Sequence, residues 1–115
     1  MDTMTAAVNH ASGDWRVRTG CEDEFVGRWT EFLQWTWENA PGFLRARLIQ
    51  DPEEPAHFIS FAEWESPAGL QAWRRLPDFA TRLGACRALC EDFRGSNYRL
   101  VIQVPLTLVE PVPTT

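Results

Sequence analysis

The stretch "FISFAEWESPAGLQAWRRLPDF", residues 58–79, joins the pattern of a strand directly to the start of a helix. Apolar side chains occupy both faces of the expected strand, with Phe58, Ala62 and Trp64 on one face and Ile59 and Phe61 on the other. Ser66 followed by Pro67 is typical of a helix N-cap and first helical position. The stretch therefore predicts a strand, apolar on both faces, that leads into a helix.

The chain upstream predicts a hairpin and a longer helix. "FLRARLIQ" (43–50) and "AHFISFAEWE" (56–65) flank the Pro-bounded turn "DPEEP" (51–55), which favours an antiparallel hairpin. Before it, Thr19 and Glu22 form a capping-box pattern, and Pro41 marks the end of the helix. The apolar face expected on this helix is Phe25, Trp29, Phe32, Leu33 and Thr36.

Strand patterns are expected at both ends of the chain. "GDWRVR" (13–18) alternates like a half-buried strand, and "AAVNHAS" (6–12) would extend it across a break near Ser12–Gly13. Downstream, Pro77 interrupts the second helix and Asp78 caps its continuation, which apolar spacing carries to Phe93. A turn at 94–97 and a last strand at 98–110 follow, with an edge or bulge at Pro105, and residues 111–115 are expected to be a flexible tail.

The order strand, helix, strand, strand, helix, strand predicts an α+β ferredoxin-like βαββαβ fold in one domain, residues 1–110. Right-handed crossovers place both helices on one face of the antiparallel sheet. The other face would leave apolar side chains in water, so we expect two chains to pack sheet against sheet as a homodimer, a dimeric α+β barrel.

Composition narrows the class of protein. The 115 residues include six Trp, have a net charge of −5 and contain no apolar run long enough for a membrane helix. Scattered arginines argue against nucleic acid as a partner. The absence of a signal-peptide pattern and three Cys, of which Cys86 and Cys90 share a helix face, favour the cytoplasm. No metal-ligand spacing is present.

The stretch at 58–79, taken with "WRVRTGCEDEFVGRW" (15–29) and "PGFLRARLI" (41–49), resembles the antibiotic biosynthesis monooxygenase family over residues 13 to 104. This resemblance implies the dimeric α+β barrel. The family includes enzymes that oxidise polycyclic aromatic polyketides with O₂ and without metal or flavin. It also includes haem-degrading members, polyketide cyclases and quinol oxygenases.

The resemblance also implies site residues. Trp64 matches a Trp that matters in the cofactor-free oxygenases, whereas the expected Asn position falls on Gly13, with Asn9 the nearest Asn. Trp73 matches the Trp of the haem-degrading branch, but the position of its His is Leu83. No haem and no other cofactor is therefore expected.

Oxygenation without a cofactor requires a site that holds a flat ring system, excludes water and stabilises negative charge on oxygen. The Trp64 indole N–H is the candidate donor, and the two histidines, His10 and His57, are candidate bases. The expected catalytic residues are Trp64, His10 and Asn9, and the expected substrate-binding residues are Trp29, Trp73, Phe58 and Arg47.

Three functions fit this pattern. The leading one is cofactor-independent oxygenation of an aromatic, polyketide-like compound with O₂. A polyketide cyclase or isomerase would use the same pocket without O₂. A non-catalytic dimeric binding protein for small molecules is the third, and Gly13 at the Asn position favours it.

Overall fold

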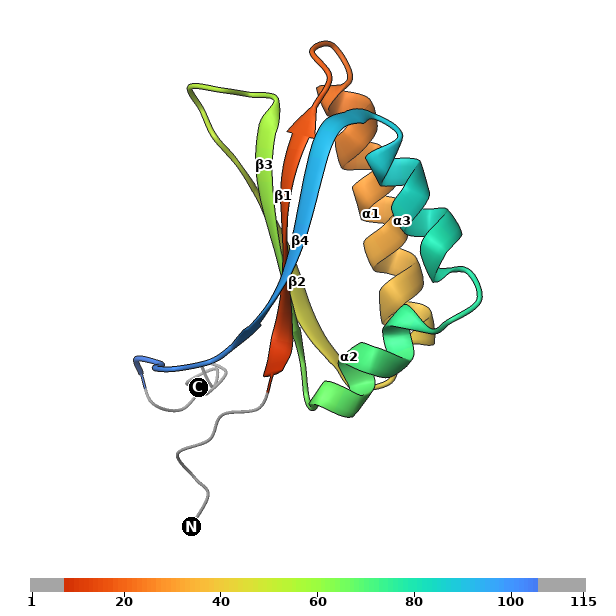
Figure 1. Ribbon diagram of the computed structural model, residues 1–115, viewed down its shortest axis with the longest axis vertical. Helices are drawn as coiled ribbons and strands as arrows, with labels where there is room; N and C mark the ends of the chain where they lie inside the picture. Colours follow the sequence, from red (N-terminus) through yellow and green to blue (C-terminus); the bar gives the residue numbers. More distant parts are fainter. Residues whose placement is uncertain (1–7, 106–115) are drawn as a thin grey trace, which may run out of the picture.

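A computed structural model describes residues 8–105 (Figure 1). Its elements, in chain order, are β1 (Val8–Val17), α1 (Glu22–Asn39), β2 (Phe43–Gln50), β3 (His57–Trp64), α2 (Pro67–Arg74), α3 (Phe79–Arg87) and β4 (Cys90–Arg99). The strands form one antiparallel sheet in the order β2-β3-β1-β4. The helices cover one face of this sheet, and the other face stays open (Figure 1). The predicted ferredoxin-like fold is confirmed, with a third helix because Pro77 separates α2 from α3.

The helix starts follow the sequence in one case and depart from it in another. At α2, the Ser66 hydroxyl accepts from the Gly69 N–H at 3.3 Å and Pro67 is the first helical residue, as predicted. The capping box at Thr19 is wrong, because α1 begins after Cys21 without a side-chain cap. Gly20 adopts a left-handed φ of +95°, and its N–H donates to the Glu22 carboxylate at 2.9 Å. Asp78 holds the N-cap position of α3 without a side-chain cap bond.

The break expected near Ser12–Gly13 is also wrong. Pairing between β1 and β3 runs without a shift from His10 to Arg16. In the pairing with β4, irregularities lie only near the two ends of β1, and one of them leaves Asn9 as an extra residue.

The largest correction concerns the end of the chain. The helix predicted to reach Phe93 ends at Arg87, and the strand predicted at 98–110 is instead β4, Cys90–Arg99. Residues 100–105 are not in a strand and bend toward the open side of the sheet (Figure 1), so no bulge forms at Pro105. The rest of the predicted strand and the predicted tail lie outside the described residues.

The core lies between the helical layer and the sheet, and it is mainly aromatic. The Trp15 ring packs against Phe25 and Phe93, with centroids 5.2 and 4.1 Å away. The predicted face of α1 is confirmed, since Phe25, Trp29, Phe32 and Thr36 are buried and Leu33 packs against the core while partly buried. No helix in residues 8–105 is long and apolar enough to cross a membrane.

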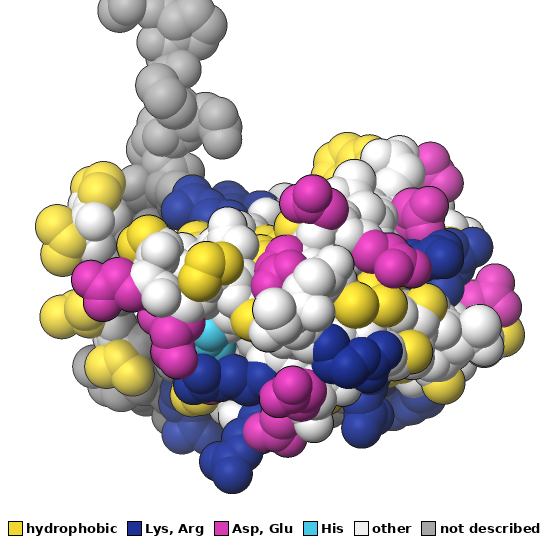
Figure 2. Space-filling view, turned by 90° about the horizontal axis from the view of Figure 1, so that it is seen from above, with side chains coloured by type: hydrophobic (Ala, Val, Ile, Leu, Met, Phe, Trp, Pro, Cys, Tyr) yellow, Lys and Arg dark blue, Asp and Glu magenta, His cyan; other side chains and the backbone are white. Residues whose placement is uncertain are grey.

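We use the name open face for the side of the sheet without helices. Alternation along the strands places Phe58, Ser60 and Trp64 on the helix side, where all three are buried. Ile59 and Phe61 therefore belong to the open face, and Phe61 is 45% exposed. Seen from the end of the molecule, basic and acidic side chains are interspersed on the surface (Figure 2).

Candidate functional site

A cavity of about 320 Å³ lies between the sheet and the helices. Small residues from three strands line it on the sheet side: Gly13 of β1, Ser60 of β3 and Gly95 of β4. Large aromatic side chains form the walls, and they are Trp15, Trp29, Phe32, Phe43, Trp73, Phe79 and Phe93. The volume is at the lower end of the range of about 300–1,000 Å³ found for small-molecule pockets. The space is therefore suited to a compact, flat and apolar molecule.

Two of the wall tryptophans are held by hydroxyl groups. The Trp15 indole N–H donates to the Ser60 hydroxyl at 3.0 Å, and the Trp73 indole N–H donates to the Thr36 hydroxyl at 3.0 Å. Thr36 in turn donates to the Phe32 carbonyl at 2.8 Å. These buried bonds fix the ring planes, so the walls are preorganised before any ligand enters.

Gly13 is required by this arrangement. A Cβ atom at position 13 would lie 2.6 Å from Trp15 Nε1 and 2.8 Å from Ser60 Oγ. Any side chain there would displace the Trp15–Ser60 pair. The resemblance places an Asn at this position, but the space that its side chain would need is filled by the Trp15 indole and the Ser60 hydroxyl.

The mouth of the cavity carries its charge. Arg74, the last residue of α2, donates from Nη2 to the side-chain carbonyl of Asn97 on β4 at 2.6 Å, and both residues line the cavity. Partial burial lowers the pKa of the Arg74 guanidinium from its ordinary value, although the side chain is still exposed to solvent. Among the described lining residues Arg74 is the only charged one, and none is Asp, Glu or His.

Of the four predicted substrate-binding residues, two line the cavity and two do not. Trp29 and Trp73 line the cavity. Phe58 does not, because it is buried against Phe25 with ring centroids 5.0 Å apart. Arg47 lies on the open face, in a separate hollow of about 550 Å³.

The predicted catalytic residues come together, but away from the cavity lining. Asn9 Nδ2 donates to the Trp64 carbonyl at 2.6 Å, and His10 Nδ1 lies 3.0 Å from Asn9 Oδ1. His10 borders the hollow on the open face. Trp64 is fully buried behind Trp73, with ring centroids 4.9 Å apart, and its indole N–H has no partner among the described residues.

Sequence reasoning missed Trp15, Ser60 and Arg74 as site residues. Trp15 and Ser60 carried a usable signal, since alternation places both on the helix side of neighbouring strands. Arg74 carried none, because its role depends on Asn97, a residue that was expected in a turn.

Cys86 lies in the core, and Cys90 packs against it while partly buried. Burial raises the pKa of the Cys86 thiol to about 12 and that of the Cys90 thiol to about 11. Both groups therefore stay protonated at neutral pH, which argues against a thiolate nucleophile at either position.

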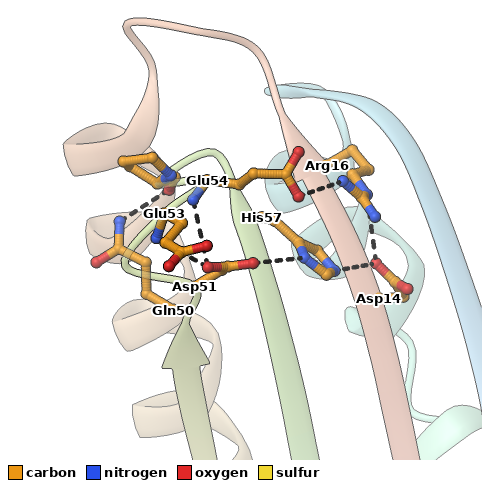
Figure 3. Close-up of polar contacts among 8 residues, drawn as sticks. Asp14, Arg16, Gln50, Asp51, Glu53, Glu54 and His57 are labelled. Atoms are coloured by element: carbon orange, nitrogen blue, oxygen red, sulfur yellow. Dashed lines mark hydrogen bonds and ion pairs between the residues drawn. The ribbon is translucent and has the colours of Figure 1, made fainter.

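A second polar cluster joins the β2–β3 turn to β1 (Figure 3). His57 Nε2 lies 2.9 Å from an Asp14 carboxylate oxygen, and its Nδ1 lies 3.8 Å from Asp51. Arg16 spans Asp14 and Glu54 at 3.8 and 3.5 Å. Candidate metal-ligating atoms of Asp51, Glu54 and His57 lie within 4.8 Å of one another, but each is already engaged in these contacts or in capping the turn. The cluster therefore holds the β2–β3 turn against β1.

A family model described as antibiotic biosynthesis monooxygenase matches residues 10–81. The chain belongs to the antibiotic biosynthesis monooxygenase family. No curated protein sequence matches it.

Solved structures show the same fold for this family member. One is SnoaB, a cofactor-independent oxygenase from Streptomyces nogalater, with 19% identity and a TM-score of 0.78 over 87% of this chain and 99% of the other. A conserved protein from Methanosarcina mazei Go1 has 15% identity and a TM-score of 0.72, over 86% and 98% of the two chains. An antibiotic biosynthesis monooxygenase has 19% identity and a TM-score of 0.68, over 81% and 98%.

Proposed function

We propose that the protein catalyses cofactor-independent oxygenation of a flat aromatic, polyketide-like compound with O₂ in the cavity beneath its helices. The observation that supports this most is the cavity itself, whose three lining tryptophans give rigid apolar walls for fused rings. Family membership and the fold shared with SnoaB agree with this chemistry.

In the proposed reaction the substrate supplies the electrons. An anthrone-type substrate loses a proton to solvent water, since the described lining offers no Asp, Glu or His as a base. Its anion passes one electron to O₂, giving a carbon radical and superoxide. The two combine to a peroxide anion, which takes up a proton and eliminates water to leave a quinone, so that one CH₂ group and one O₂ become one carbonyl group and one water. The protein therefore has to bind the rings, exclude water and stabilise the anion.

Ser60 is the proposed donor to the anionic oxygen. Its hydroxyl accepts from Trp15, which leaves its own hydrogen available to a ligand in the cavity that it lines. Accepting the indole N–H polarises the hydroxyl and makes it a stronger donor. Trp64 remains a predicted donor from the family pattern, and its position behind Trp73 gives it a supporting role in the wall.

We also propose a cytoplasmic homodimer that forms through the open face. Apolar side chains are exposed on or next to this face, namely Ile49, Phe61, Tyr98, Leu100, Val101, Ile102 and Val104. The free cysteines fit a reducing compartment. Analytical ultracentrifugation tests the assembly, and a monomer at micromolar concentration would contradict it.

Oxygen uptake by purified protein with an anthrone tests the proposed reaction. We expect uptake and quinone formation in equal amounts, and no product under nitrogen. Anaerobic turnover to a cyclised product would instead identify a cyclase. Binding without turnover would identify the non-catalytic binding protein.

A further inference from the structure

Arg74 places a single positive charge at the mouth of an otherwise uncharged cavity. It ends α2, whereas Asn97 lies on β4, so their hydrogen bond of 2.6 Å spans two walls. No carboxylate lines the cavity in the part of the chain that the structure describes. A bound molecule would therefore meet a cation at the opening and aromatic rings farther in.

This cation lacks a carboxylate partner within residues 8–105. Among the described residues, Arg16, Arg28 and Arg45 pair with acidic side chains. Arg74 is one of several arginines that do not, and among these it is the one that lines the cavity. The only described contact of the Arg74 side chain is with the neutral amide of Asn97. A guanidinium has five N–H donors in a planar fork, so most of its donors remain available.

An anionic group would be a better partner than the amide. Charge-assisted hydrogen bonds are about twice as strong as neutral ones, and a carboxylate fits the guanidinium fork with two parallel bonds. Arg74 is itself exposed, so an anionic group can reach it from solvent. A bound anion would therefore accept hydrogen bonds from Arg74, either in place of Asn97 or in addition to it.

We propose that the ligand of this cavity is a flat apolar ring system that bears an anionic oxygen group, and that Arg74 binds this group at the mouth and determines specificity. The inference rests on the proposed function only in placing a flat aromatic ligand in the cavity. It assigns the orientation of the ligand as well, with the fused rings toward Trp29 and Trp73 and the charged oxygen toward α2.

Two probes of matched shape test the proposal by isothermal titration calorimetry. They are anthraquinone-2-carboxylate and anthraquinone-2-carboxamide, which differ in charge at one substituent. We expect the wild-type protein to bind the carboxylate about tenfold more tightly, a difference of about 1.4 kcal/mol. Arg74→Gln should remove this preference and leave the affinity for the carboxamide unchanged.

Arg75→Gln is the matched control. Arg75 is exposed like its neighbour Arg74 but does not line the cavity, so its loss should leave the preference intact. Equal loss of preference in both variants would show a general charge effect and overturn the proposal. An unchanged affinity for the carboxamide also shows that Arg74→Gln has kept its fold.

The remaining outcomes separate this inference from the proposed reaction. Equal wild-type affinity for the two probes would overturn the role of Arg74 while leaving the cavity as a ligand site. An Arg74-dependent preference for the carboxylate in a protein that consumes no oxygen would support the inference and refute the oxygenase. Binding of neither probe would overturn both.

Discussion

Trp15 of β1 and Ser60 of β3 share a hydrogen bond of 3.0 Å that fills the space a side chain at position 13 would need. The pair couples two neighbouring strands and also shapes the cavity that both residues line. Changes at this point should therefore affect stability and function together.

Gly13→Ala should destabilise the protein. The new methyl group would meet Trp15 and Ser60 at 2.6 and 2.8 Å, and relieving such overpacking costs about 1–3 kcal/mol. Urea unfolding measures this loss. The control is Gly27→Ala, at an exposed position of α1 with no atom within 4 Å of the new Cβ, which should stabilise by up to about 1 kcal/mol. A Gly13→Ala variant as stable as the wild type would show that Trp15 and Ser60 can move aside without a loss of stability.

Ser60→Ala should lower both stability and turnover. It leaves the buried Trp15 N–H without an acceptor, which costs about 1–3 kcal/mol. Loss of one donor to the developing anion lowers kcat by about 10²–10³-fold. Thr36→Val provides the comparison, because it breaks the equivalent hydrogen bond of Trp73 although Thr36 itself does not line the cavity. We expect it to reduce stability similarly and kcat by less than about tenfold. Equal kcat losses in the two variants would refute the donor role of Ser60.

Trp64→Phe tests whether Trp64 is catalytic, as the family pattern implies, or only packs behind the cavity wall, as its position indicates. The ring is buried behind Trp73 and does not line the cavity, so we expect a stability loss of about 1–3 kcal/mol and only a small change in kcat. Steady-state oxygen uptake and urea unfolding measure the two effects. A fall in kcat of a hundredfold at unchanged stability would instead support catalysis by the Trp64 indole.

Cys86 and Cys90 should resist alkylation in the folded state. Burial raises the pKa of Cys86 to about 12 and that of Cys90 to about 11, so very little thiolate is present at pH 8. Incubation with iodoacetamide followed by mass spectrometry should leave Cys86 unmodified, whereas all three cysteines should react in denaturant. Rapid labelling of Cys86 under native conditions would contradict its burial.

Asp51 should make stability depend on acidic pH. Hydrogen bonds from the backbone N–H groups of Glu53 and Glu54 stabilise its carboxylate and, with His57 nearby, lower its pKa from the ordinary 3.8. A depressed folded-state pKa gives stability that is fully present above 3.8 and is lost as the pH falls through the folded value.

The difference in Tm between wild type and Asp51→Asn should therefore be present at pH 7 and shrink below the ordinary pKa. Thermal unfolding monitored by circular dichroism measures it. Glu53→Gln is the control, because its side chain makes no polar contact among the described residues. A difference that stays constant down to pH 2.5 would exclude the Asp51 carboxylate as its cause.

Much of the fold could be predicted because its signals are local. Ser66 and Pro67 mark a helix start by their own chemistry, and the alternation around Phe58 and Phe61 marks a strand within a few residues. Residues 90–99 gave no such signal. The inward positions of β4 include Gly95 and Asn97, which line a cavity instead of packing against a core, so apolar alternation is absent.

The site was harder to predict for the same reason. Large aromatics such as Trp29 and Trp73 were recognisable as candidate walls, and both line the cavity. The catalytic group proposed from the family pattern, centred on Trp64, lies outside that lining. The polar contacts that shape the cavity join residues distant in sequence, as Trp15 and Ser60 or Arg74 and Asn97 do, and only the sheet register brings them together.

The tryptophan walls also allow ligand binding to be followed by the intrinsic fluorescence of the protein. Three of the six tryptophans, Trp15, Trp29 and Trp73, line the cavity, so an occupant would contact half of the indole fluorophores in the chain. A quinone accepts electrons from an excited indole on contact and would quench its emission. Compound collections can therefore be screened by loss of intrinsic fluorescence, without a label and before any turnover assay exists.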